Sequence, residues 1–346
     1  MRAVTYREHG GLEVIDVGEL PTLEPGPGQV RVKVAACAMN HLDVWVRRGI
    51  PGVKLEMPHI PGADIAGTID AVGVGVSGWA VGAPVVVHPV LSCGRCRACA
   101  AGQDNQCRHF GLVGEHARGG MAEYLIIAAG NLVAAPAGLP LAELAAIPTT
   151  FLTAWQMLVT KANVRPGETV LVLAAGSGVG VAGVQIARLL GAEVIAAAST
   201  DDKLARAREL GAHHGINYAT ADLVAETRRI TGKRGVDVVF EHVGAATWDK
   251  SILAAARGGR IVTCGSTSGH MAQTDLRHVF FRQLTIYGST MGTKADLLDI
   301  LDHVAKGRLK PVIDSQIAMT RDAIVAAHER LEARGPFGKI LVIPAT

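Results

Sequence analysis

The pattern of apolar and polar positions changes along the chain near residue 169. Before about residue 133, apolar residues stand in short runs that Gly and Pro interrupt, which is typical of strands joined by tight turns. The clearest of these runs cover residues 13–17, 29–35, 65–72 and 84–88. The first part of the chain is therefore predicted to be a mostly-β, barrel-like domain.

After residue 169 the pattern alternates between short apolar strands and helices. Strand-like runs lie at 170–174, 193–198, 236–241, 260–264 and 284–289, and helical patterns lie at 179–190, 203–210, 246–256 and 294–306. Repeated βα units of this kind build a parallel sheet with helices on both faces. This part is predicted to be a doubly wound Rossmann domain.

The last segment, residues 337–344, is again short and β-like. We expect it to return to the first domain, which makes the Rossmann domain an insertion. The sequence thus predicts an α/β protein in which residues 1–150 and 310–346 form the mostly-β domain and residues 151–309 form the Rossmann domain.

Composition excludes several classes of protein. Of the 346 residues, 49% are hydrophobic and 19% are charged, which suits a densely packed globular chain and not a disordered one. The formal net charge of +3 is too small to predict binding to nucleic acid or to a membrane surface. Two uncharged stretches, 71–94 and 124–142, contain Gly or Pro that would interrupt a membrane-spanning helix. With charged residues at the N-terminus in place of a secretory signal, we expect a cytoplasmic protein.

Four of the six cysteines fall within fifteen positions, in the spacing C-x2-C-x2-C-x7-C. Four thiolates close a tetrahedral zinc site completely, as structural zinc sites require. An iron–sulfur cluster also takes four cysteines, but the spacing before the last one differs from the bacterial ferredoxin run and no Pro follows it. The sequence therefore predicts one structural zinc ion held by Cys93, Cys96, Cys99 and Cys107.

A glycine-rich turn separates the strand-like run at 170–174 from the helical pattern that follows it. Backbone N–H groups at such a turn, together with the helix dipole, hold the pyrophosphate of a dinucleotide. A second strand ends about twenty residues later, as a dinucleotide fold requires. The predicted pyrophosphate-binding residues are Gly176, Ser177, Gly178, Val179 and Gly180.

At the end of that second strand an NAD site usually carries an acidic residue, but this chain has Ser199 and Thr200 there. A hydroxyl group, with Lys203 one helical turn further on, suits a 2′-phosphate that a carboxylate would repel. The sequence therefore favours NADP(H) over NAD(H). The alternative is that Asp201 or Asp202 reaches a ribose hydroxyl and that Lys203 is a solvated helix residue.

Together with the run Gly62-Ala-Asp-Ile-Ala-Gly, these motifs resemble the medium-chain dehydrogenase/reductase superfamily over nearly the whole chain. The resemblance implies a GroES-like catalytic domain beside the Rossmann domain. In the zinc alcohol dehydrogenases of this family a Cys, a His and a further Cys hold a catalytic zinc ion. Asn40, Ala63 and Thr149 stand at those places here, so we expect the catalytic zinc site to be lost. His59 could in principle join Asp64 in an unusual metal site, although a surface or turn position is expected for it.

The run Asn40-His-Leu-Asp-Val-Trp-Val-Arg-Arg-Gly is similar to the N-x-x-D-x-x-x-R-x-G motif of the zinc-free quinone oxidoreductase branch. In that branch the Asn lies near the nicotinamide and the substrate. The resemblance implies that Ser199, Lys203 and Tyr218 hold the 2′-phosphate. It implies further cofactor contacts at His41, on the pyrophosphate side, and at Thr153, Val243 and Gly265, around the nicotinamide. Those reductases normally lack the four-cysteine loop and have Gly where Ser177 stands.

The expected function is NADPH-dependent hydride transfer to a quinone or an α,β-unsaturated carbonyl, without catalytic zinc. Asn40 is the candidate donor to the acceptor oxygen, with a structural turn role as its rival, and Asp43 is expected to orient the helix start. The alternatives are a zinc-binding alcohol or aldehyde dehydrogenase that uses NAD(P) and a non-enzymatic NADPH-binding protein. A homodimer or homotetramer is expected from the resemblance alone.

Overall fold

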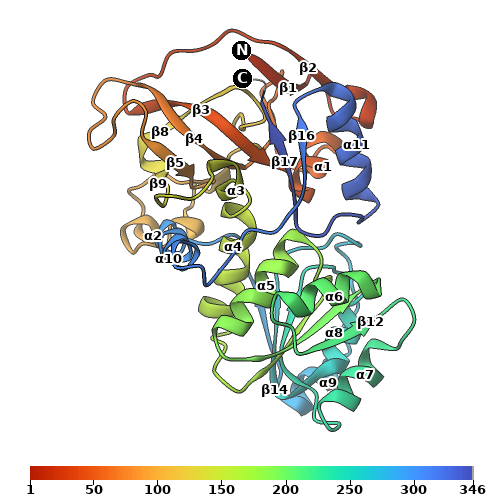
Figure 1. Cartoon of the computed structure of the whole chain (residues 1–346). Coiled ribbons are helices and arrows are strands. Elements are labelled where there is room, and N and C mark those ends of the chain that lie inside the picture. Colours follow the sequence, from red (N-terminus) through yellow and green to blue (C-terminus); the bar gives the residue numbers. More distant parts are fainter. Residues whose placement is uncertain (345–346) are drawn as a thin grey trace. The chain divides into compact units, whose positions relative to one another are not determined.

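The structure is a computed structural model that describes residues 1–344 (Figure 1). The chain divides into two compact units, one made of Met1–Thr149 together with the chain from Thr293 onward, the other of Thr150–Gly292. The second unit is therefore an insertion in the first, as the return of the last β-like segment suggested. Its end differs from the predicted boundary, because the first unit resumes at residue 293 and not at residue 310.

The first unit is built on a seven-stranded sheet in the order β16-β17-β3-β4-β5-β9, with β8 paired to β3. All neighbours are antiparallel except β16 and β17, which run parallel. Two small two-stranded sheets, β1-β2 and β6-β7, complete it. The strands are β1 (Arg2–Tyr6), β2 (Ile15–Glu19), β3 (Gln29–Ala38), β4 (Asp64–Val72), β5 (Pro84–Val87), β6 (Val90–Leu91), β7 (Gly111–Leu112), β8 (Tyr124–Ala128), β9 (Leu132–Ala134), β16 (Ile313–Ala318) and β17 (Lys339–Ile343).

Alternation along β3 explains how this sheet forms a core. Val30, Val32 and Val34 are buried on one face, because successive side chains of a strand point to opposite faces. They pack in a mainly aliphatic cluster to which strands from both ends of the unit contribute. Gly67 of β4 lies so close to β3 that an added Cβ would come within 2.1 Å of the Lys33 carbonyl oxygen. The two central strands therefore pack tightly where β4 carries no side chain.

The helices of the first unit are α1 (His41–Arg48), α2 (Arg97–Ala100), α3 (Leu141–Leu144), α10 (Lys294–Ala305) and α11 (Arg321–Glu332). The position of α10 accounts for the shifted boundary. Its first backbone N–H, at Lys294, donates to Asp104 (3.2 Å), and the Lys294 ammonium donates to the Gly130 carbonyl (2.8 Å). The helical pattern at 294–306 was correct, but these contacts join the helix to the first unit.

The second unit contains a six-stranded sheet in the order β12-β11-β10-β13-β14-β15, with every neighbouring pair parallel. This order is that of a doubly wound dinucleotide fold, and it confirms the predicted fold class. The strands are β10 (Thr169–Val172), β11 (Glu193–Ala198), β12 (His214–Asn217), β13 (Val236–Glu241), β14 (Ala255–Thr263) and β15 (Thr285–Gly288). The helices are α5 (Gly178–Leu189), α6 (Asp201–Glu209), α7 (Leu223–Ile230), α8 (Trp248–Ala254) and α9 (Leu276–Arg282). Helix α4 (Pro148–Trp155) leads into the unit and continues as a π-helix, Gln156–Lys161.

Strand β10 ends two residues earlier than predicted. Ala174 has φ of 43°, a left-handed conformation that no strand residue adopts. The chain therefore leaves the sheet at Leu173 and begins the glycine-rich turn there. Strand β12 and helix α7 were not predicted, because the run at 214–217 carries no apolar alternation.

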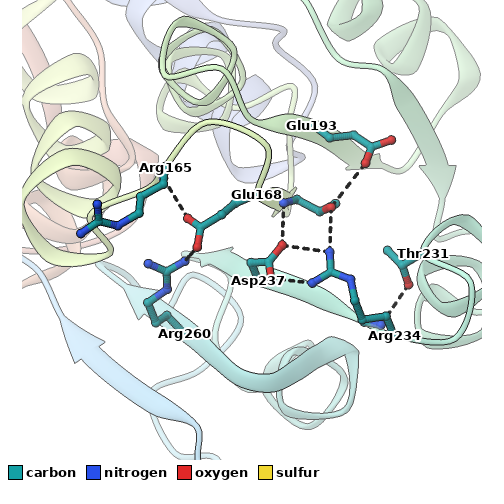
Figure 2. A network of polar contacts seen from close by, with 9 residues as sticks. Arg165, Glu168, Glu193, Thr231, Arg234, Asp237 and Arg260 are labelled. Carbon is teal, nitrogen blue, oxygen red and sulfur yellow. Dashed lines mark hydrogen bonds and ion pairs between the residues drawn. The ribbon is translucent and has the colours of Figure 1, made fainter.

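Charged side chains connect the amino ends of the central strands in the second unit (Figure 2). Arg234 bonds both oxygens of Asp237 (2.5 and 2.9 Å), and Asp237 accepts the backbone N–H of Thr169 (2.8 Å). Arg260 of β14 forms an ion pair with Glu168 and donates to the Ala162 carbonyl (2.6 Å). These contacts tie the start of β10 to β13 and β14, at the end of the sheet opposite the glycine-rich turn.

Within residues 1–344, the helices are all too short or too polar to cross a bilayer. The uncharged stretches at 71–94 and 124–142 form short strands and turns in the first unit, as their Gly and Pro residues predicted.

Candidate functional site

The four clustered cysteines lie in one loop of the first unit, between β6 and β7. Their sulfur atoms all lie within 4.8 Å of one another. The separations are 3.5 Å for Cys96 and Cys99, 3.9 Å for Cys96 and Cys107, and 3.5 Å for Cys107 and Cys93. Four sulfurs around one zinc ion at about 2.3 Å stand roughly 3.8 Å apart. The four thiols therefore fit a closed tetrahedral zinc site.

Local backbone groups prepare this loop for a cation. The backbone N–H groups of Cys99 and Arg108 lower the pKa of Cys96 to about 6, and the backbone N–H of Arg95 lowers the pKa of Cys93. A lower thiol pKa favours the thiolate, which is the form that binds metal. Cys107 accepts the backbone N–H groups of Cys93 and His109, both at 3.3 Å. The loop backbone thus favours the thiolate at Cys93 and Cys96, whereas desolvation raises the pKa of Cys99 to about 11.

The glycine-rich turn joins β10 to α5 in the second unit. Ser177 caps the helix, and its hydroxyl accepts the backbone N–H of Gly180 (3.0 Å). An added Cβ at Gly180 would lie 2.4 Å from the Ala174 carbonyl oxygen, so only glycine fits there. The first N–H groups of α5, at Gly178 and Val179, have no intrahelical acceptor by the geometry of a helix start. The turn therefore offers backbone donors to an anion, as the pyrophosphate prediction requires.

Sequence reasoning missed Gly183, one turn further along α5. An added Cβ there would meet the Phe240 ring of β13 at 3.1 Å. This glycine lets the helix pack closely against the sheet. The start of the helix therefore lies near the carboxyl ends of the strands. Its spacing from Gly178 and Gly180 was a usable signal in the sequence.

The predicted 2′-phosphate residues lie where β11 and β12 end side by side. Ala198 and Asn217 are paired in the parallel register, so Ser199 and Tyr218 follow at neighbouring strand ends. The backbone N–H of Tyr218 donates to the Ala198 carbonyl (3.1 Å), and the ring is 40% exposed.

Helix α6 begins immediately after Ser199. The Thr200 hydroxyl accepts the backbone N–H of Lys203 (3.3 Å) and so caps the helix. Asp201, the rival contact for a ribose, accepts the side-chain amide of Asn217 (2.9 Å). One Asp201 oxygen is therefore already used within the protein. Ser199 and Tyr218 directly follow two neighbouring strands, and Lys203 lies in the first turn of α6.

The predicted nicotinamide-side residues lie on α4 and in two loops of the second unit. Thr153 is buried on α4, and its hydroxyl donates to the Met291 sulfur (3.8 Å). Val243 follows β13, and its carbonyl accepts the Ser268 hydroxyl (2.7 Å). Gly265 follows β14, and its carbonyl accepts the Thr263 hydroxyl (3.4 Å). The structure thus brings Val243 and Gly265 to the carboxyl ends of adjacent strands.

Glu241, which sequence reasoning did not identify, holds the Val243 loop in place. The carboxylate has no exposed surface and accepts the backbone N–H groups of Val243 (2.6 Å) and Gly244 (3.0 Å). Its other oxygen accepts the hydroxyls of Thr247 (2.8 Å) and Ser251 (2.6 Å). Four donors satisfy this buried charge, so the loop after β13 has a fixed course.

His41, the predicted pyrophosphate contact, is the first residue of α1 in the first unit. Its ring packs edge-on against Trp45, with centroids 5.2 Å apart. Burial lowers the pKa of His41, and the nearby charges of Arg334 and Arg48 lower it further. The imidazole is therefore biased toward its neutral form.

Asn40 and Asp43 form the start of α1. The backbone N–H of Asn40 donates to Asp43 Oδ2 (2.7 Å), and that of Gly62 donates to Asp43 Oδ1 (3.0 Å). Asp43 thus joins the helix start to the Gly62 turn, in agreement with the orienting role expected for it. The Asn40 side-chain amide also has partners outside the helix.

Those partners are Asp64 on β4 and Lys339 on β17. Asn40 Nδ2 donates to Asp64 Oδ2 (2.9 Å), and the Lys339 ammonium donates to Asn40 Oδ1 (2.5 Å) and to Asp64 Oδ2 (2.8 Å). The backbone N–H of Thr149 donates to Asp64 Oδ1 (2.6 Å). We name Asn40, Asp64 and Lys339 the amide–ion cluster. Lys339 was not identified from the sequence, because no local motif marks it.

Within the amide–ion cluster, Asn40 stands at the place where the family resemblance puts a cysteine ligand of a catalytic zinc ion, and Asp64 directly follows Ala63, which stands at the place of the histidine ligand. An amide, a carboxylate and an ammonium group do not fit that role, since the ammonium is itself a cation bonded to the one carboxylate. Ala63 contributes no donor atom. His59 is only 2% exposed, which corrects its expected surface position, and its Nε2 is bonded to the Gly114 carbonyl (3.0 Å). Its ring is thus engaged away from Asp64.

The sequence and the fold of the chain are similar to those of known dehydrogenases and reductases. A family model described as alcohol dehydrogenase GroES-like domain matches residues 26–137, and one described as zinc-binding dehydrogenase matches residues 178–306. Human quinone oxidoreductase is 29% identical to the chain, over 99% of this chain and 98% of the relative. A 2-haloacrylate reductase from Burkholderia sp. is 31% identical, over 99% of both chains. A solved structure described as an NAD-dependent alcohol dehydrogenase is 51% identical, with a TM-score of 0.95 over 99% of both chains.

The cysteine geometry predicts one zinc ion per chain in protein purified without added metal. Replacing Cys107 by Ser should remove that zinc and lower the thermal stability of the first unit, because the structural ion holds the loop together. Cys264→Ser, which changes a cysteine of the second unit, is the matched control and should retain one zinc. Elemental analysis of the three proteins checks this, and two zinc ions per chain would contradict the interpretation of the amide–ion cluster.

The burial of Asp43 predicts that the free energy of unfolding depends on pH. Burial raises the pKa of Asp43 to about 6, whereas the unfolded value is about 3.9. The folded state thus keeps a proton that the unfolded state releases, so stability should fall by about 3 kcal/mol as pH rises from about 4 to about 6. Asp43→Asn should remove this part of the slope. Denaturant unfolding of both proteins between pH 4 and pH 7 measures it, and equal slopes would show that Asp43 does not titrate in this range.

Proposed function

Since the chain belongs to the medium-chain dehydrogenase/reductase superfamily and is an NAD(P)-dependent oxidoreductase, we propose that it reduces a quinone or an α,β-unsaturated carbonyl with NADPH and without catalytic zinc. The amide–ion cluster is the observation that carries this proposal. Its Asn40 amide is a hydrogen-bond donor at the place in the motif where zinc dehydrogenases carry a ligand cysteine.

The chemistry of the two substrate classes explains the preference. Oxidation of an unactivated alcohol needs the hydroxyl pKa to be lowered, which a metal ion does well and an amide does poorly. A quinone or an enone is already electrophilic, so hydride addition needs only alignment and a donor for the oxygen that gains negative charge. The amide–ion cluster therefore suits quinones and enones better than unactivated alcohols.

In the proposed reaction the bound nicotinamide supplies the hydride, as it does in related oxidoreductases. The Asn40 side-chain amide donates a hydrogen bond to the acceptor oxygen while that oxygen becomes an enolate or a hydroquinone anion. A proton from water then completes the two-electron reduction. Asp43 acts only by holding the start of α1, since both its oxygens already accept backbone N–H groups.

The cofactor would be held by residues of the second unit and by His41 of the first. The N–H groups of Gly178 and Val179, in the turn formed by Gly176, Ser177 and Gly180, would bind the pyrophosphate. Ser199, Thr200, Lys203 and Tyr218 would bind the 2′-phosphate, and Thr153, Val243 and Gly265 would border the nicotinamide, with His41 on the pyrophosphate side. The preference for NADP(H) is supported by the hydroxyl and ammonium groups at the ends of β11 and β12.

A second candidate is alcohol oxidation with NAD. It is favoured by the 51% identity to a structure described as an NAD-dependent alcohol dehydrogenase. Asp201 would then accept a hydrogen bond from a ribose hydroxyl, although one of its oxygens already accepts a hydrogen bond from the Asn217 amide. Turnover of alcohols in preference to quinones and enones would select this candidate.

We also propose a homo-oligomer formed through the second unit. Strand β15 lies at the edge of the sheet and pairs with β14 on one side. Phe280 and Phe281 of α9 are 59% and 66% exposed, and Ile286 of β15 is 40% exposed. Apolar side chains next to a free strand edge suit a strand-to-strand contact with a second copy.

Cofactor preference is tested by the dissociation constants of NADPH and NADH. NADPH should bind the wild-type protein at least tenfold more tightly than NADH, because Ser199, Lys203 and Tyr218 pair with the 2′-phosphate. Lys203→Ala should weaken NADPH about tenfold and leave NADH unchanged. Lys250→Ala removes an exposed lysine of the same unit and should change neither constant. Equal affinities for the two cofactors in the wild-type protein would defeat the assignment.

The reaction is tested with a panel of quinones, enones and primary alcohols. The wild-type enzyme with NADPH should turn over members of the first two classes, and Asn40→Ala should lower kcat about 10²-fold, the usual effect of losing one donor to an oxyanion. The dissociation constant of NADPH should change little, since Asn40 is proposed to contact the acceptor oxygen and not the cofactor. Unchanged turnover in the variant would remove Asn40 from the mechanism, and tight cofactor binding without any turnover would indicate a non-enzymatic protein.

A further inference from the structure

We propose that Lys339 is a positioning residue for the reaction, which fixes the Asn40 amide with its N–H outward and neutralises the charge of Asp64. This inference rests on the proposed function and deepens it. It identifies the buried cation next to Asn40 as a side chain of β17.

The contacts determine which way the amide of Asn40 points. An ammonium group only donates and a carboxylate only accepts. With Lys339 on one side and Asp64 on the other, Oδ1 must face Lys339 and Nδ2 must face Asp64. The second Nδ2 hydrogen has only a long contact of 3.4 Å with the Ala38 carbonyl. That hydrogen is the one available to an acceptor oxygen.

The charges of the cluster explain why the cation matters for turnover. The side chains of Asp64 and Lys339 are 0% and 4% exposed, so solvent screens neither of them well. Without Lys339, a buried carboxylate would stand beside the amide and oppose the negative charge that forms on the acceptor oxygen. With Lys339 the pair has no net charge, and the dipole of the amide acts alone.

Lys339 acts through Asn40 and not on the substrate directly. Its ammonium is almost fully buried and has two of its three hydrogens engaged. The backbone around it is held firmly, since the N–H of Lys339 donates to the Val312 carbonyl (2.9 Å) and the N–H of Met39 donates to the Ile340 carbonyl (2.9 Å). Strand β17 also pairs with the end of β3, where Leu341 faces Ala38. A rigid strand thus sets the position of the ammonium, which in turn sets that of the amide.

A purely structural role for Lys339 makes a different prediction. Breaking a buried ion pair destabilises a fold strongly, whichever partner is removed, and a neutral pair restores much of the loss. A structural lysine would therefore change thermal stability and leave kcat of the folded enzyme intact. A positioning lysine changes kcat in protein that is still folded and that still binds NADPH.

The test compares kcat, the acceptor KM and the NADPH dissociation constant in Lys339→Met, Lys339→Arg, Asp64→Asn and the double variant Asp64→Asn/Lys339→Met. We expect Lys339→Met to lower kcat about 100-fold with KM changed less than threefold and NADPH binding unchanged. Lys339→Arg keeps the cation and should stay within tenfold of wild type. Asp64→Asn leaves the Lys339 ammonium unpaired and alters the group that Asn40 Nδ2 faces, so it should also lower kcat, but less than Lys339→Met does. The double variant restores neutrality and should regain about tenfold over Lys339→Met.

Lys306→Met, which removes an exposed lysine of the same unit, is the matched control and should turn over like wild type. A Lys339→Met enzyme with kcat within threefold of wild type would overturn the inference. If Lys339→Met does not fold, the charge-balanced double variant decides the question, and wild-type kcat in that protein would overturn the inference. Absence of turnover by the wild-type enzyme on the quinone and enone panel would instead refute the proposed function, and this inference with it.

Discussion

Asp64 brings a carboxylate into the interior of the first unit, where its side chain has no exposed surface. A buried charge of this kind is tolerated only when it is paired and hydrogen-bonded. The groups that satisfy it come from the start of α1, the start of α4 and the first residue of β17. The position of each of these elements is therefore tied to one pair of oxygen atoms, and the geometry offered to a substrate depends on the same pair.

The two halves of the proposed chemistry differ in how visible they are in the sequence. A short local pattern was enough to propose the turn at Gly176–Gly180 and Ser199, which directly follow strands, whereas Tyr218 came from the family resemblance, because the strand before it has no apolar alternation. Asn40 was found from its motif, but its partners were not. Lys339 stands at the start of an ordinary apolar strand, and only the antiparallel pairing of β17 with β3 brings it to Asn40. Long-range pairing of this kind leaves no trace in local periodicity.

Boundaries were predicted less well than elements, for a related reason. The helix at 294–305 has a clear amphipathic pattern. This pattern predicts that one face of the helix is buried, but it does not predict which unit that face packs against. Its capping box, in which Thr293 accepts the N–H of Asp296 and Asp296 accepts that of Thr293, was also local. The contact of Lys294 with Asp104, within the cysteine loop, joins the helix to the first unit. The same carboxylate lies 3.6 Å from the buried His88, so the loop, α10 and β5 form one connected region.

The sequence separation of Asp64 and Lys339 has a consequence for biosynthesis. The two residues are 275 positions apart, and the whole second unit lies between them. At a ribosomal rate of about 5–20 residues per second, roughly 14–55 s pass between the synthesis of the carboxylate and that of its counter-ion. During that interval β3 has no β17 to pair with, while the inserted second unit is being synthesised. The Asp64 carboxylate thus remains without its counter-ion until nearly the whole chain has been made.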